Sequence, residues 1–248
     1  MMSSEKTTHF GFETVEWDEK EQKVAAVFNA VAQNYDFMND IMSLGIHRLW
    51  KRLTVELAQV RNTHTILDLA GGSGDLSRLL CKSAKPYVVL ADINAEMLNL
   101  GRDRLIDQGA HANSAAILAN AENLPFANNS FDCIIIGFGL RNFTDKTKAL
   151  KSALRTCKPG GKIMILEFST PKLPYLKPIY ELYLLKILPK LGEFFAHDAT
   201  SYRYLAESIS VHPSQDELKS LIERAGFEDC YYYNFSGGIV ALHIAYKY

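Results

Sequence analysis

From residue 65 onward, short apolar and β-branched runs alternate with segments rich in helix-forming residues. Strands that alternate with helices favour parallel pairing, because each crossover helix returns the chain to the same edge of the sheet. The parallel strands are expected at Thr65–Ala70, Tyr87–Asp92, Ala115–Ala119, Phe131–Phe138 and Lys162–Phe168. The chain is therefore predicted to be an α/β, doubly wound fold around a mostly parallel sheet.

Helices are expected between and after these strands, at Asp75–Ser83, Asn94–Gln108, Asp145–Cys157 and Ser214–Ala225. Two final strands, Tyr231–Phe235 and Ile239–Tyr246, flank a Gly-Gly pair that is typical of a hairpin turn, and they bring the sheet to seven strands. We expect one domain, 1–248, made of an N-terminal helical cap (20–60), a cofactor-binding core (61–170), a helical insertion after the fifth strand (174–208), and a final helix and hairpin (213–248). The cap is expected to hold two or three helices, broken near Asn34–Asp36 and Ser43–Gly45.

Composition excludes several classes of protein. A formal net charge of -1 gives no electrostatic case for nucleic acid binding. The four cysteines are widely spaced with no CxxC pair, so we expect free thiols in a reducing compartment and no zinc site. The first 21 residues lack the apolar core of a signal peptide, and no run approaches the about 18 apolar residues of a membrane span. A cytoplasmic location is therefore expected.

A strand, a glycine-rich turn and a helix follow one another over Leu67–Asp75, and the turn consists of Gly71, Gly72, Ser73 and Gly74. Glycines let the backbone approach a ligand closely and adopt positive φ, and the helix N-terminus offers free N–H groups. In a nicotinamide site those groups bind pyrophosphate, and in an S-adenosylmethionine (SAM) site they receive the methionine carboxylate. A plain tight turn is the alternative.

Asp92 ends the second strand, where a carboxylate accepts hydrogen bonds from the ribose hydroxyls of either NAD or SAM. The alternative is a cap for the helix that begins near Asn94. The dinucleotide pattern G-x-G-x-x-G needs its third glycine at the position of Ser77, and its absence disfavours NAD.

Later motifs favour SAM. Asn120–Phe126 follows the third strand, where a SAM site places its adenine contacts, so Asn120 and Ala121 are predicted to lie beside adenine. Asp132 near the start of the fourth strand and Lys158–Gly161 before the fifth complete an order that resembles class I SAM-dependent methyltransferases, which are Rossmann-like. The final hairpin also separates methyltransferase folds from most dinucleotide-binding folds.

Five segments indicate one particular family among these methyltransferases. They are Thr8–Phe12, Tyr35–Ser43 with its continuation to Trp50, Phe138–Asn142, Arg155–Ser169 and Ser201–Ile209. They resemble the ubiquinone/menaquinone biosynthesis C-methyltransferase family over nearly the whole chain. The resemblance implies methyl transfer from SAM, without a metal, to a ring carbon of a prenylated quinol: 2-polyprenyl-6-methoxy-1,4-benzoquinol, demethylmenaquinol, or both. Gly137, which is predicted to contact the cofactor, stands where the family commonly has a serine, so a side-chain contact is lost there.

Arg141 and Asn142 follow the fourth strand, at the carboxyl edge where sites of α/β proteins lie. A guanidinium stays protonated, so we predict that Arg141 stabilises the quinolate oxygen or holds a water, and that Asn142 orients this water. The alternatives are a surface salt bridge for Arg141 and a cap of the next helix for Asn142.

The insertion supplies the predicted substrate contacts. Tyr183 and Leu184 are predicted to meet the isoprenoid tail, with core packing as the alternative. His197, Asp198, Tyr202 and Arg203 gather polar groups, and we expect Tyr202 and Arg203 to bind the quinol head.

Prenylated quinols reside in the bilayer, yet the chain has neither a span nor a lipidation motif. We therefore expect transient contact with the inner membrane face, a protein complex of quinone biosynthesis, or both. The oligomeric state stays open, a homodimer included. The nearer alternative function is methylation of another small molecule. The remote ones are a nicotinamide oxidoreductase and a non-catalytic lipid carrier or scaffold.

Overall fold

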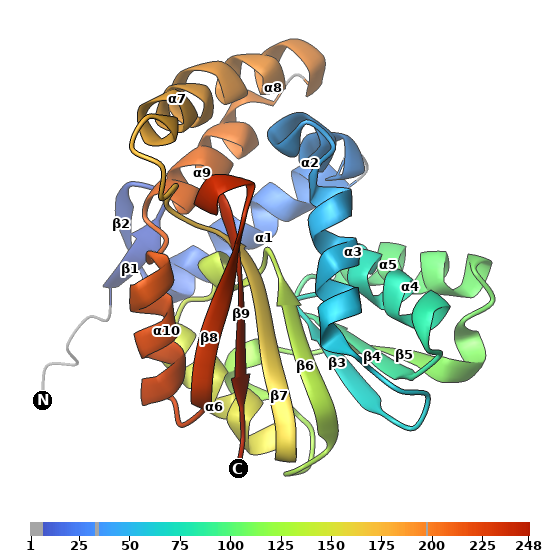
Figure 1. The fold of residues 1–248 in the computed structure, drawn as a ribbon. Helices are drawn as coiled ribbons and strands as arrows, with labels where there is room; N and C mark the ends of the chain where they lie inside the picture. The colour runs from blue at the N-terminus through green and yellow to red at the C-terminus, as the bar shows by residue number, and fades with distance from the viewer. Residues whose placement is uncertain (1–6, 33–34, 197) are drawn as a thin grey trace, which may run out of the picture.

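The centre of the molecule is a seven-stranded sheet, which a computed structural model describes together with the rest of residues 7–32, 35–196 and 198–248. Its strands are β3 (Thr65–Leu69), β4 (Tyr87–Asp92), β5 (Ser114–Leu118), β6 (Phe131–Gly137), β7 (Cys157–Phe168), β8 (Glu228–Phe235) and β9 (Val240–Tyr246). They lie in the order β5-β4-β3-β6-β7-β9-β8 (Figure 1). The pairs among β3 to β7 are parallel, whereas β9 runs antiparallel to both β7 and β8. The predicted mostly parallel sheet with its final hairpin is confirmed.

The sheet is buried on both faces, as β6 illustrates. Cys133 and Ile135 pack in the core beneath α3 (His47–Ala58), α4 (Asp75–Ser83) and α5 (Ala95–Asp107). Ile134 and Ile136 pack on the opposite face beneath α6 (Lys146–Thr156) and α10 (Gln215–Arg224). Each fully buried isoleucine is worth about 1.5–3 kcal/mol, so the apolar run of β6 stabilises both layers at once.

Side-chain caps explain why the helices of the core begin where the sequence predicted. Asn94 accepts a hydrogen bond from the Met97 N–H at 3.0 Å and so caps α5. Asp145 caps α6 by accepting from Lys148 N–H at 2.9 Å. Such caps are worth about 1 kcal/mol each and mark a helix start locally.

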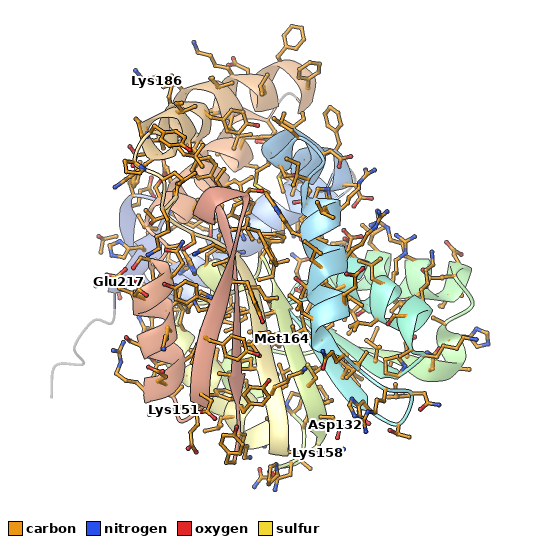
Figure 2. The ribbon with its side chains drawn as sticks, in the orientation of Figure 1. Asp132, Lys151, Lys158, Met164, Lys186 and Glu217 are labelled. Carbon is orange, nitrogen blue, oxygen red and sulfur yellow. The ribbon has the colours of Figure 1, made fainter. Side chains whose placement is uncertain are left out.

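The start of β7 differs from the prediction, because Lys158–Gly161 lies within the strand and not before it. Asp132 and Lys158 form an ion pair of 2.8 Å at the amino end of the sheet, where both are labelled in Figure 2. An irregularity in the β6–β7 register between Phe131 and Cys133 accommodates the glycines of this segment.

The N-terminal region holds α1 (Trp17–Val31) and α2 (Tyr35–Ser43) before α3, which confirms a helical cap, although it begins earlier than residue 20. The break before α3 contains Leu44 and Gly45, both with positive φ. A hairpin of β1 (Thr7–Phe10) and β2 (Glu13–Glu16) was not predicted, because strands of four residues carry too little alternation. The hairpin is held by tertiary contact: Phe10 stacks on Tyr204 with 4.2 Å between ring centroids.

The insertion after β7 is helical, as predicted, and consists of α7 (Leu176–Leu182), a π-helical turn (Tyr183–Ile187), α8 (Leu188–Ala196) and α9 (Ala199–Ser210). We call residues 176–196 the arm; it lies beyond the carboxyl ends of the parallel strands (Figure 1). Tyr180, Leu184 and Leu188, spaced by four, are buried on its inner side. None of the described helices is both long and apolar enough to span a bilayer.

Candidate functional site

A cavity of about 150 Å³ lies at the carboxyl ends of the parallel strands. Five of the residues predicted to form the site line it: Gly72, Asp92, Asn120, Ala121 and Asn142. The cavity is thus shared by the glycine turn, the end of β4, the loop after β5 and the loop after β6. The predicted convergence of these segments is observed.

The glycine turn holds two residues in the left-handed region, Gly72 with φ 53° and Gly74 with φ 76°. A Cβ on Gly74 would approach Gly101 Cα to 3.3 Å, so α5 packs tightly against the turn. Gly72 N–H donates to Asp92 Oδ2 at 2.8 Å, which joins the turn to the end of β4. Gly71, Ser73 and Gly74 lie outside the cavity lining, and their predicted cofactor contacts stay predictions.

Asp92 is held by two backbone donors. Its Oδ2 accepts from Gly72 N–H and its Oδ1 accepts from Asn94 N–H, both at 2.8 Å. Burial raises the pKa of Asp92, and the backbone donors oppose that rise. Because Asn94 itself caps α5, the alternative that Asp92 is the helix cap is wrong. The rigid carboxylate lines the cavity with lone pairs available to a ligand.

Asp68 is a buried carboxylate on β3 beside the glycine turn; it does not line the cavity, and the sequence reasoning gave it no role. Its Oδ2 accepts from Ser77 N–H at 2.9 Å and from Ser77 Oγ at 2.6 Å, while the buried Oδ1 has no partner in the described part of the chain. Burial raises the pKa of Asp68 to about 6. A carboxylate oxygen left unpartnered beside the glycine turn suits a cationic group such as the ammonium of SAM. The available signal was a charged residue inside an apolar strand.

The loop after β5 forms an apolar slot. Asn120 Oδ1 accepts from Glu122 N–H at 2.8 Å, which fixes the side chain and leaves its amide N–H groups without a partner among the described residues. Ala121, Ile93 and Met97 line the cavity beside it. Small and flexible apolar side chains with one free amide donor fit a flat heteroaromatic ring such as adenine.

Helix α1 also lines the cavity, through Glu21, Val24, Ala25 and Phe28. The sequence reasoning placed this helix in the cap but gave it no role at the site. Lys20 anchors the helix there, because its buried ammonium donates to Phe143 O at 2.9 Å. Burial lowers the pKa of Lys20 to about 7. In residues 7–32, 35–196 and 198–248, no group of three His, Cys, Asp or Glu side chains has the arrangement of a metal site.

Arg141 lies in a buried ion pair with Glu167, with 3.0 Å between Nη1 and Oε1. The guanidinium also donates to Phe138 O and lies over the Phe168 ring. Glu167 Oε2 in turn accepts from Arg141 N–H at 3.2 Å. The alternative of a surface salt bridge is therefore wrong. Arg141 does not line the cavity but fixes the loop that carries Asn142.

Asn142 faces the cavity and is oriented by Tyr204, whose hydroxyl donates to Asn142 Oδ1 at 2.9 Å. Tyr204 comes from α9, 62 residues further along the chain, and the sequence reasoning missed it. Asp145 caps α6, so the alternative that Asn142 caps it is wrong. The Asn142 amide nitrogen remains available to a ligand.

The other predicted substrate contacts lie elsewhere. Tyr202 is buried in the core, packed against Gly192, and its hydroxyl has no partner among the described residues. Arg203 is exposed and outside the cavity lining. Tyr183 donates to Ile41 O at 2.7 Å, and Leu184 is buried in the core. The positions of Tyr183 and Leu184 agree with core packing of the inner side of the arm, and the roles of all four residues in substrate binding stay predictions.

The remaining three residues singled out in the sequence are Gly137, Asp198 and His197. A Cβ on Gly137 would collide with Leu76, so the glycine makes room for α4 and does not line the cavity. Asp198 caps α9 by accepting from Ser201 N–H at 2.9 Å. His197 lies outside the described residues.

Known proteins are similar to this chain in sequence and in fold. Residues 16–247 match the model of the ubiE/COQ5 methyltransferase family. The chain is 63% identical to the ubiquinone/menaquinone biosynthesis C-methyltransferase UbiE of Legionella pneumophila (strain Paris) over the whole of both chains. It is 56% identical to UbiE of Vibrio cholerae, over 99% of this chain and 95% of that protein. A SAM-dependent methyltransferase from Aquifex aeolicus has a similar fold, with a TM-score of 0.60, 17% identity, and 85% and 96% of the two chains covered.

Proposed function

The chain belongs to the ubiE/COQ5 methyltransferase family, and we propose that its reaction, SAM-dependent C-methylation in ubiquinone and menaquinone biosynthesis, takes place in the cavity that Asp92 and Asn142 line. The main support for this location is that one cavity is lined by two suitable groups. One is the carboxylate of Asp92, at the end of β4, which can accept hydrogen bonds from a ribose; the other is the amide of Asn142, after β6, which Tyr204 orients. The substrate is a prenylated quinol. A single-turnover assay with methyl-labelled SAM and demethylmenaquinol tests the activity, with the label expected on a ring carbon.

The residues around the cavity fit SAM along its length. Asp68 and the glycine turn receive the methionine end, Asp92 accepts from the ribose hydroxyls, and Asn120 lies beside adenine. The bound cofactor supplies an activated sulfonium methyl group. The chain's own task is then to align the acceptor carbon with that methyl, which through effective molarity contributes about 7–11 kcal/mol.

The loop after β6 carries the second half of the site. Asn142, with its orientation set by Tyr204, holds the quinol hydroxyl or a water next to it. The buried cation of Arg141 lies one residue away and favours the ionised quinol, whose ring carbon is then nucleophilic. The hydroxyl proton would pass to water when the quinolate forms. The ring carbon would then bond to the methyl as the methyl–sulfur bond breaks and S-adenosylhomocysteine is released, and the ring C–H proton would pass to water. Glu167 keeps Arg141 in place throughout.

Removal of the Tyr204 hydroxyl tests this orientation. We expect Tyr204→Phe to retain the stack on Phe10 but to lower kcat by about threefold to tenfold, the equivalent of one hydrogen bond. SAM affinity is expected to be unchanged, because the hydroxyl contacts only Asn142. Tyr232→Phe is the matched control, since the Tyr232 hydroxyl also donates one hydrogen bond, to Asp216 Oδ1 at 2.7 Å, and does not line the cavity. Equal kcat values for the two variants would contradict the role of Tyr204.

The outer face of the arm exposes apolar side chains, and these are Ile179, Leu182, Leu185, Ile187, Phe194 and Phe195. Phe194 is 75% exposed and Phe195 55% exposed. Lys186 extends from the same arm (Figure 2). Isolated exposed apolar residues are ordinary, but a contiguous group typically marks an interaction surface. We infer that this face rests on the bilayer that holds the prenylated quinol, while Tyr183 and Leu184 of the inner side stay the predicted contacts of the tail.

Charges placed on the outer face test membrane contact. Phe194→Asp with Phe195→Asp is expected to weaken binding to phospholipid vesicles by more than tenfold, because each inserted phenylalanine is worth about 1.5–3 kcal/mol. Activity on a long-tailed quinol in vesicles should fall, whereas activity on a short-tailed analogue in solution should not. Ile106→Asp, on the exposed side of α5, is the control and should bind vesicles normally. Equal losses on both substrates would argue against the surface.

A further inference from the structure

A second cavity, of about 310 Å³, lies between α3 and α4 and shares no lining residue with the first. Its lining includes five cations and two carboxylates: Arg48, Lys51, Arg52, Arg78, Lys82, Asp36 and Asp75. Methyl transfer as derived above uses none of them. The cavity is therefore unexplained by the reaction.

The two carboxylates are already neutralised. Asp75 pairs with Lys51 at 2.6 Å, and Asp36 pairs with Arg104 through two hydrogen bonds of 3.1 and 2.9 Å. Arg48 pairs with Asp40 on the rim. In the described structure Arg52 and Lys82 have neither an ion-pair nor a hydrogen-bond partner. An excess of positive charge thus remains in the cavity.

The placement of these cations is unfavourable for the free protein. Arg48 and Arg52 are four residues apart on α3, and Arg78 and Lys82 are four residues apart on α4. Like charges at this spacing face each other on one side of a helix and repel. Here both pairs line one cavity, and because Asp40 partly neutralises Arg48, the repulsion falls mainly on the other three cations. A bound anion relieves both repulsions at once.

We propose that the cavity between α3 and α4 binds a phosphate group, either in a lipid headgroup or in a soluble phosphate compound. Guanidinium groups hold phosphate through paired N–H donors, and a lysine adds a point charge. Exposed Leu44, Ile46 and Leu49 lie next to Arg48 in the chain. The same region joins the arm, because Phe37 of α2 contacts the Phe195 ring at 6.2 Å between centroids. Apolar side chains beside a phosphate site suit a phospholipid.

The test variant is Arg52→Gln with Lys82→Gln, which removes two cations without a partner. Its matched control is Arg61→Gln with Lys85→Gln, which removes the same charge from exposed positions outside the cavity. Because the first variant relieves repulsion, its melting temperature should not fall below that of the wild type. SAM affinity should be unchanged in both variants. The test measures phosphate binding and not methyl transfer, so its outcome does not depend on whether the proposed function is correct.

Two probes separate the sources of phosphate. Inorganic pyrophosphate binding is followed by calorimetry, and vesicle binding is followed by sedimentation with phosphatidylcholine alone or mixed with phosphatidylglycerol. The test variant should bind at least one probe about tenfold or more weakly than wild type, and the control should match wild type. If the test variant loses binding only to anionic vesicles, the ligand is a lipid headgroup. If it loses binding only to pyrophosphate, the ligand is a soluble phosphate compound, and if it loses binding to both, the two share the site. The proposal is overturned if wild type binds neither probe, if the test variant binds both normally, or if the control loses as much.

Discussion

Replacing Arg141 with alanine is expected to lower both the stability of the protein and its turnover. The substitution leaves the Glu167 carboxylate buried without its cation, and breaking a buried pair in this way costs about 3–5 kcal/mol. Turnover should fall by about 10²-fold, because Arg141 fixes the loop that carries Asn142, and a displacement of about 1 Å near the reacting atoms has an effect of this size. Denaturant unfolding and stopped-flow measurement of the methyl-transfer step give the two values separately.

A second variant separates the two effects. Arg141→Met with Glu167→Gln removes both charges and keeps one acceptor oxygen, which can serve the N–H of residue 141 or that of Phe168 but not both. Part of the lost stability should return, while turnover stays low because the loop that carries Asn142 still lacks its buried cation. Arg141→Lys should rescue poorly, since an ammonium does not reproduce the guanidinium fork. Methyl transfer at the wild-type rate in Arg141→Ala would show that the cation is not used.

The Asp92→Ala variant is expected to bind SAM about tenfold to hundredfold more weakly, because hydrogen bonds to a charged group are worth about 1.5–3 kcal/mol. The N–H groups of Gly72 and Asn94 also lose their acceptor, so the glycine turn should loosen. A lower melting temperature is therefore expected, with the fold retained. Calorimetric titration of SAM into the folded variant measures the affinity.

The control for Asp92 is Asp132→Ala. Asp132 also accepts a backbone hydrogen bond, from Thr65 N–H at 2.8 Å, but it lies at the opposite end of the sheet beside Lys158 (Figure 2). Its removal should reduce stability without changing SAM affinity. If both aspartate variants bind SAM like the wild type, the ribose contact assigned to Asp92 is wrong.

The core of the fold was predictable because its signals are local. The strand at Tyr87–Asp92 and the helix at Asp75–Ser83 have the predicted bounds, since an apolar run and a glycine turn mark them directly. Caps such as Asn94 act within three residues of themselves and need no tertiary information. The hairpin at Thr7–Phe10 carried no such signal and depends on Phe10 meeting Tyr204.

The sequence by itself determined which residues of the core strands converge on the cavity. Gly72, Asp92 and Asn120 follow consecutive strands of a parallel sheet, and the carboxyl ends of such strands meet at one edge. Their convergence therefore follows from the strand order alone. The same reasoning placed Asn142 at that edge.

Only the tertiary structure decided the partners of the residues in the loop after β6. Tyr204 reaches Asn142 across 62 residues, and Glu167 reaches Arg141 across 26 residues. Lys20 brings α1 over the cavity from 123 residues away. No local pattern encodes such pairs, because each depends on how an insertion or cap packs against the sheet. A charged residue in a buried strand, such as Glu167, indicates that it has an ion-pair partner. Only the packing of the folded chain determines which residue that partner is.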